Sequence, residues 1–198
     1  MAWSKKPARY EDIAALPVGW VGEIVEDELM ASPRPAMGHG HAASALGGAL
    51  MGPFAWGQGG PGGWWLLDEP ELHFGRDVLV PDLAGWRRER LPRAFSPEEP
   101  FTTLAPDWVC EVLSPSTAAF DRERKLPRYY REGVAHVWLI EPRVRRLTVL
   151  RRGTSRWRRV AMHEGDAAVR AEPFDAVALE LGRLWLPGRA EGTDASTR

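Results

Sequence analysis

The chain of 198 residues has little cysteine and no long apolar segment. A single cysteine, Cys110, excludes a disulfide framework and a zinc site built from cysteines. No apolar run approaches the ~18 residues of a membrane span, and the N-terminal residues lack the apolar region of a signal peptide. We therefore expect a cytoplasmic protein without a membrane segment. Its length predicts one domain over residues 1–188, followed by a disordered tail over residues 189–198.

Lysine is also scarce, and the net charge is close to zero. Of the 26 basic residues only Lys5, Lys6 and Lys125 are lysines, and the formal net charge is -1. The arginines gather between residues 87 and 93 and between residues 143 and 159, where they could contact phosphates or simply form solvated surfaces. Lysine and arginine are not interchangeable where a compact ammonium is needed. The isolated Lys125 is therefore a candidate functional residue.

The hydrophobic pattern predicts a single mixed α/β domain, with a central sheet flanked by helices. Pro127 predicts a break near residue 126 in the helical stretch that follows Ser116, and Gly133 is placed to end the second half of that stretch. The other expected elements are a short helix over 10–16, a hairpin over 20–31, a helix over 37–54, strands over 64–74, 77–86, 108–113 and 136–141, and a hairpin over 145–163.

Two acids interrupt otherwise apolar strands. Asp82 is expected to share one strand face with Val78, Val80 and Ala84. Glu111 lies within a strand that reads as buried on both faces, where an acid is costly unless it is paired or bound to a metal. These two acids are the candidates for metal ligands.

A lysine on the next helix completes the pattern. Lys125 follows Asp121 by one helical turn. Phosphodiester hydrolysis needs a divalent metal held by carboxylates, which polarises the phosphate and activates a water. A nearby lysine can position that water or stabilise the developing charge. The residues therefore fit the needs of a metal-dependent phosphodiesterase.

Each candidate also has a purely structural interpretation. Asp82 could cap a turn after Pro81, and Glu111 could form a buried salt bridge. Lys125 could be the i,i+4 partner of Asp121 on a solvated helix. Tyr129, one turn further along, reads as a core residue.

A resemblance to a known family adds to this pattern. The segments LVPDLAGW and PDWVCEVLSPSTAAFDRERKLPRYYREGVAHVWLIEP resemble the Uma-type family of restriction endonucleases, within the PD-(D/E)XK nuclease superfamily. The upstream segment GEIVEDELMASPRPAMGHGHAASAL is similar to the family's N-terminal part, a hairpin followed by a histidine that opens a helix. The resemblance covers about residues 10–160. It implies a restriction-endonuclease-like fold and a Mg²⁺- or Mn²⁺-dependent endonuclease acting on nucleic acid, with DNA the expected substrate.

Carried over by position, the resemblance gives the strand acids and the lysine catalytic roles. Asp82 fills the PD position and Glu111 the (D/E) position, both as metal ligands. Leu113 stands where the superfamily motif has lysine, and Lys125 takes the place of that lysine from the following helix. In the implied mechanism Lys125 orients the nucleophilic water.

The N-terminal part of the resemblance supplies further candidates. Glu23 matches the acid of the family hairpin and could complete the metal shell, or it could pair with an arginine. His41 matches the histidine, with either an accessory role or a capping or packing role, and Asp121 is a second accessory candidate. Asp27 stands where the family usually has glycine, so the hairpin turn could differ.

Two other functions fit the same residues. The chain could be a catalytically inactive nucleic-acid-binding or interaction protein on a nuclease scaffold, which the near-neutral charge favours. It could also hydrolyse another kind of phosphate ester. Cleavage of both DNA strands by a one-site domain would favour a two-fold homodimer.

Overall fold

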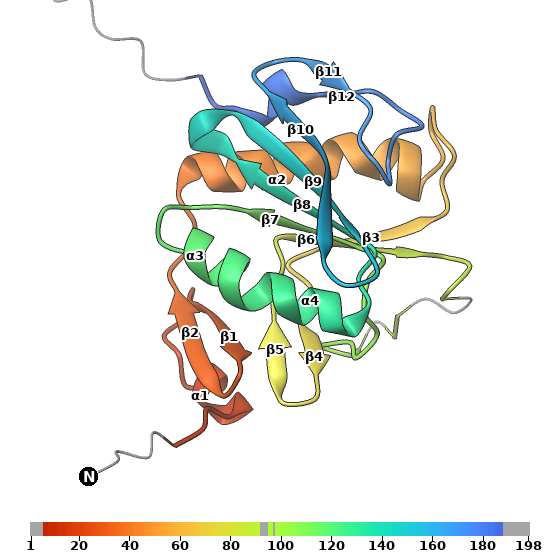
Figure 1. The fold of residues 1–198 in the computed structure, drawn as a ribbon. Coiled ribbons are helices and arrows are strands. Elements are labelled where there is room, and N and C mark those ends of the chain that lie inside the picture. The colour runs from red at the N-terminus through yellow and green to blue at the C-terminus, as the bar shows by residue number, and fades with distance from the viewer. Residues whose placement is uncertain (1–5, 92–94, 97, 188–198) are drawn as a thin grey trace, which may run out of the picture.

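The computed structural model describes residues 6–91, 95–96 and 98–187, which form two main sheets flanked by helices (Figure 1). The tail predicted over residues 189–198 lies outside the described residues. In the part of the chain that the structure describes, no helix is long and apolar enough to cross a membrane.

The larger sheet has six strands in the order β10-β9-β8-β7-β6-β3. Strands β7 and β8 are parallel, and the other neighbouring pairs are antiparallel. The predicted mixed α/β class is therefore confirmed. The strands are β3 (Trp64–Asp68), β6 (Leu83–Arg87), β7 (Trp108–Val112), β8 (His136–Glu141), β9 (Arg146–Arg152) and β10 (Trp157–Glu164).

The smaller sheet contains the predicted N-terminal hairpin. Its strands β1 (Val21–Val25) and β2 (Glu28–Ser32) continue through β5 (Asp77–Leu79) to β4 (Leu72–Phe74), in the order β2-β1-β5-β4. Glu26 and Asp27 form the two-residue turn with φ values of 54° and 65°. Both values lie in the left-handed region that this kind of hairpin requires, so the turn forms without the family's glycine. The short helix α1 (Tyr10–Ala14) contacts the hairpin.

Helices cover both faces of the larger sheet (Figure 1). Helix α2 (Met37–Leu50) continues into a wider turn, η1 (Met51–Ala55), on one face. The other face carries α3 (Ala118–Phe120), η2 (Asp121–Lys125) and α4 (Leu126–Glu132). The remaining elements are η3 (Pro142–Val144), β11 (Ala168–Val169), β12 (Leu179–Glu180) and η4 (Leu181–Leu184).

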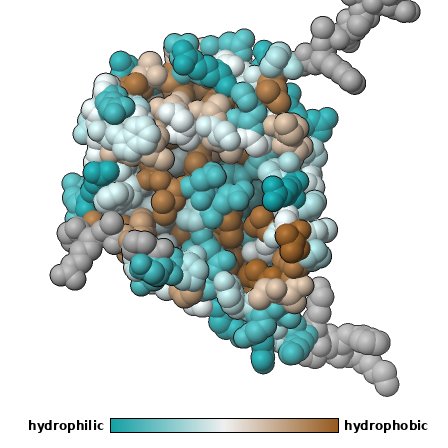
Figure 2. Space-filling model, turned by 180° about the vertical axis from the view of Figure 1, so that it is seen from behind, coloured by the Kyte–Doolittle hydropathy of each residue, from teal (hydrophilic) through white to brown (hydrophobic). Residues whose placement is uncertain are grey.

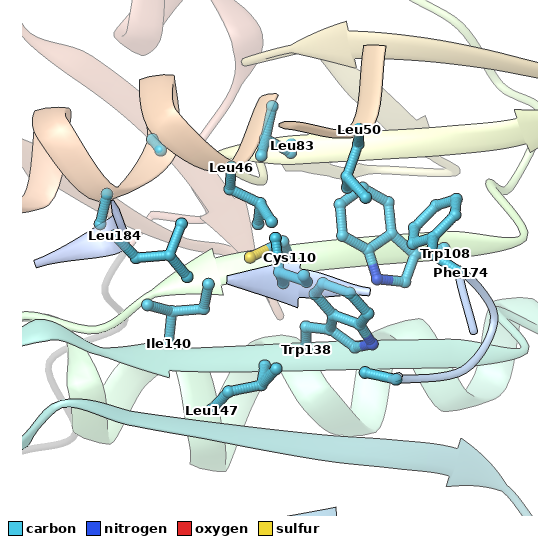
Figure 3. Close-up of a cluster of buried hydrophobic side chains, with 14 of the residues drawn as sticks. Leu46, Leu50, Leu83, Trp108, Cys110, Trp138, Ile140, Leu147, Phe174 and Leu184 are labelled. Atoms are coloured by element: carbon cyan, nitrogen blue, oxygen red, sulfur yellow. The ribbon is translucent and has the colours of Figure 1, made fainter. Parts of the chain in front are cut away.

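Strand β7 belongs to both cores because its side chains alternate between the two faces. Trp108 and Cys110 lie in the cluster between the sheet and α2, together with Trp138 and Phe174 (Figure 3). Val109 lies in the cluster on the opposite face, beneath α4. The predicted alternation is confirmed, and Cys110 is a core residue as expected. On the molecular surface, hydrophobic side chains form patches separated by hydrophilic ones (Figure 2).

Two predicted strands are each divided between the two sheets. The segment 64–74 separates into β3 and β4 at Glu69–Pro70, and the segment 77–86 separates into β5 and β6 at residues 80–82. Proline has no N–H to donate to a strand ladder, so Pro81 marks the place where the chain leaves one sheet for the other. The expectation that Asp82 continues the strand face of Val78 and Val80 is therefore wrong. Asp82 instead lies at the junction of the two sheets.

The helix before Gly133 does not break at Pro127. Asp121–Lys125 forms a π-helical turn, and Leu126–Glu132 follows directly as an α-helix with proline in its first turn. Proline stands in the first turn of the α-helical segment, directly after the wider π-helical turn, which is a common place for a helix to accommodate it. The boundary predicted near 126 coincides with the change from this turn to α4, but the backbone stays helical through it, so Lys125 lies inside a longer helical stretch. Gly133 ends this stretch with a φ of 87°, as predicted.

Candidate active site

A pocket lies where the two sheets and the start of the 118–132 helical stretch meet. Its inner wall carries four carboxylates and one ammonium, with Arg34 and Glu69 among its other polar residues. The inner residues come from four elements that are distant in sequence: Glu23 from β1, Asp82 from the junction before β6, Glu111 from β7, and Asp121 and Lys125 from η2.

Lys125 is buried among these acids, with only 2% of its side chain exposed. Its Nζ lies 2.8 Å from Glu23 Oε1, 2.8 Å from Glu111 Oε1 and 3.7 Å from Asp121 Oδ1. It also donates to the Val80 carbonyl at 3.2 Å. Lys125 is therefore not a solvated helix residue, and its i,i+4 contact with Asp121 is the longest of the set.

The charges around Lys125 keep it protonated. Burial alone would lower the pKa of Lys125, but the carboxylates of Glu111 and Glu23 outweigh burial and raise that pKa well above its usual value. At neutral pH the side chain is therefore an ammonium, able to donate hydrogen bonds and to stabilise negative charge. It is not available to accept a proton.

Glu111 shares one of its oxygens between two donors. Its Oε1 is 2.8 Å from Lys125 Nζ and accepts a hydrogen bond from the Tyr129 hydroxyl at 2.6 Å. Tyr129 is thus buried as predicted, yet its polar end reaches the site. Burial raises the pKa of Glu111 well above its usual value. The positive charge of Lys125 lowers this pKa in part, whereas the negative charges of Asp121 and Asp82 raise it further. Both contacts use Oε1, so Oε2 is the oxygen that can face a ligand.

Asp82 is held by the neighbouring strand rather than by its own turn. Its Oδ2 accepts the Val112 backbone N–H at 2.6 Å, and its Oδ1 lies 3.2 Å from His39 Nε2. The bond to Val112 ties Asp82 to the residue directly after Glu111. Burial raises the pKa of Asp82 to about 7, an effect that the Val112 bond and Lys125 only partly offset.

Glu23 positions the lysine. Its Oε1 contacts Lys125 Nζ and also accepts the Val80 backbone N–H, both at 2.8 Å. Its partner is therefore a lysine and a strand backbone, not an arginine. The junction between β5 and β6 therefore positions several site residues at once. The backbone of Val80 bonds Glu23 and Lys125, and Asp82 follows Val80 by two residues.

The two histidines of α2 lie in different places. His39 lines the pocket beside Asp82, and burial lowers its pKa. His41 Nε2 instead lies 3.0 Å from the carbonyl of Arg183, and His41 is not among the residues that line the pocket. Residues two apart on an α-helix point in nearly opposite directions, so only one of the pair can face the site. The structure gives no support to an accessory role for His41.

The donor set suits a hard divalent cation. Magnesium is typically bound by one or two carboxylates and several waters, and Asp82 and Glu111 offer two. In the described part of the chain no group of three or more Asp, Glu, His or Cys side chains is arranged to hold an ion. The buried acids also outnumber the buried ammonium, and burial, reinforced by the neighbouring acids, raises the pKa values of Asp82 and Glu111.

The fold is that of a restriction-endonuclease-like domain, and comparison with known proteins agrees. The family model described as "Uma2: Putative restriction endonuclease" matches residues 5–182, so the chain belongs to that family. This confirms the resemblance seen in the sequence and supports a nuclease function in general terms.

A solved structure shares the same fold. The crystal structure of "a putative nuclease belonging to DUF820" from Anabaena variabilis aligns with a TM-score of 0.70 at 22% sequence identity, covering 90% of this chain and 97% of that one. Likeness at this identity establishes the fold alone. A search of curated proteins found no match.

Proposed function

We propose that the chain is a metal-dependent endonuclease that hydrolyses phosphodiester bonds of nucleic acid, with DNA as the expected substrate. One observation carries the proposal: the two strand acids Asp82 and Glu111 border one pocket with the buried ammonium of Lys125. Membership of a restriction endonuclease family supports it.

Asp82 and Glu111 would hold the metal, Mg²⁺ or Mn²⁺. When bound, such an ion polarises the phosphate and lowers the pKa of a bound water. Asp82 is already oriented by the Val112 N–H, and Glu111 is oriented through Oε1 by Lys125 and Tyr129. The protein thus fixes both carboxylates before any ligand arrives.

Lys125 would stabilise negative charge on the phosphate and orient the attacking water. An ammonium has three N–H donors, and Glu23, Glu111 and the Val80 carbonyl occupy its three nearest contacts. A contact with water or substrate must therefore replace one of these bonds. The bond to Val80, at 3.2 Å, is the longest of the three. Glu23 and Asp121 would keep the ammonium in place during this exchange.

Cleavage assays test the proposal directly. Purified protein should nick or linearise supercoiled plasmid in Mg²⁺ or Mn²⁺, and excess EDTA should abolish the activity. Single-stranded DNA, RNA and a small phosphate ester should be assayed in parallel. Absence of cleavage on all nucleic acids would contradict the proposal, and activity on the small ester alone would favour a different phosphoesterase.

A further inference from the structure

His39 is a pocket residue for which the site described above has no role. It lies in the first turn of α2, and 15% of its side chain is exposed. Its Nε2 is 3.2 Å from Asp82 Oδ1. Its Nδ1 is buried without a hydrogen-bond partner among the described residues. The ring therefore lies between the Asp82 carboxylate and the backbone of Val112.

The Asp82 carboxylate is held from two sides. The Val112 N–H bonds Oδ2 from strand β7, and His39 reaches Oδ1 from helix α2. A carboxylate held by one hydrogen bond can still turn about its Cβ–Cγ bond, whereas a second side chain packed against the other oxygen restricts that rotation. Val112 belongs to the same strand as Glu111, so the hydrogen bond from Val112 also fixes Asp82 relative to the other acid.

We propose that His39 is a positioning residue that orients Asp82 for binding a divalent cation. In this arrangement the ring of His39 lies against Oδ1 while the Val112 N–H holds Oδ2. Hydrogen-bonded partners of metal ligands typically contribute 10–100-fold to metal affinity. The inference rests on the proposed function, because it concerns the same metal site.

The chain offers matched variants to test this role. His39→Ala removes the ring that lies against Asp82, and His39→Gln keeps a polar group close to the position of Nε2. His39→Asn also keeps an amide but is too short to reach Asp82 in the same way. His41→Ala is the control, since it removes a histidine from the same helix whose ring contacts the Arg183 carbonyl.

The experiment is calorimetric titration of Mn²⁺ into each full-length protein at pH 8, above the pKa of about 7 of Asp82. Melting temperatures in EDTA are measured beside it. His39→Ala and His39→Asn should weaken Mn²⁺ binding by roughly 10–100-fold, His39→Gln should recover part of this loss, and His41→Ala should bind as wild type does.

Three results would overturn the inference. His39→Ala could bind Mn²⁺ as wild type does, His39→Gln could be as weak as His39→Ala, or His41→Ala could lose as much affinity as His39→Ala. In each of these cases wild-type binding of Mn²⁺ leaves the proposed function standing. Absence of Mn²⁺ binding by wild type would instead overturn both together.

Discussion

Glu111→Gln should lower metal-dependent cleavage by roughly a thousandfold. Loss of a metal-ligand carboxylate removes several kcal/mol of charge stabilisation, and about 4 kcal/mol corresponds to that factor in rate. Glutamine has nearly the same shape, so it can still fill the space beside Tyr129 and Lys125. The rate is measured on plasmid at saturating Mg²⁺, and circular dichroism checks the fold.

The control for this prediction is Glu141→Gln. Glu141 ends β8, the parallel neighbour of β7, and pairs with Arg122 outside the pocket lining. The same chemical change there should leave the rate within about twofold of wild type, because an exposed ion pair contributes little. Full activity of Glu111→Gln, or an equal loss in Glu141→Gln, would rule out the role given to Glu111.

Lys125→Met should lower the free energy of unfolding by roughly 3–5 kcal/mol, because breaking a buried ion pair leaves uncompensated charge in the interior. The carboxylates of Glu23 and Glu111 each lose a partner at 2.8 Å. Urea unfolding in EDTA measures the change. Adding Glu111→Gln to Lys125→Met should recover much of the loss, since the double variant buries one fewer unpaired charge.

The loss in Lys125→Met should also depend on pH. The pKa of Glu111 already lies well above its usual 4.5, and removing the ammonium raises it further. The folded variant then binds a proton that the unfolded chain has released, so its stability falls as pH rises above about 4.5. The deficit relative to wild type should therefore be smaller in mild acid than at neutral pH.

Arg122→Met is the matched surface variant for Lys125→Met. Arg122 lies on the same π-helical turn, is 41% exposed and pairs with Glu141 at 3.1 Å. Its replacement should cost no more than about 1 kcal/mol. Equal losses in the two variants would show that Lys125 is not the central counter-charge of the buried acids.

The sequence was most informative where local pattern and chemistry coincide. The continuous apolar run of β7 identified Glu111 as an acid in a buried strand, and the rarity of lysine drew attention to Lys125. The structure brings these two side chains to 2.8 Å and places Asp82 in the same pocket. Their roles in metal binding and catalysis remain predictions.

The features that the sequence did not predict depend on contacts between segments that are far apart in the chain. The division of residues 77–86 between two sheets at Pro81 depends on how the N-terminal hairpin joins β5. The choice between His39 and His41 depends on the rotation of α2 about its axis, which sequence spacing leaves open. The π-helical turn that carries Lys125 has no clear signature beyond the proline that follows it.

Binding of Mn²⁺ to wild type and Asp82→Asn, measured by calorimetry at pH 8 in EDTA-stripped protein, tests the central claim most directly. Wild type should bind the ion, and Asp82→Asn should weaken binding by roughly 100-fold or more, because one of two protein ligands loses its charge. Absence of binding by wild type, or equal affinity in both proteins, would contradict a metal site at Asp82 and Glu111.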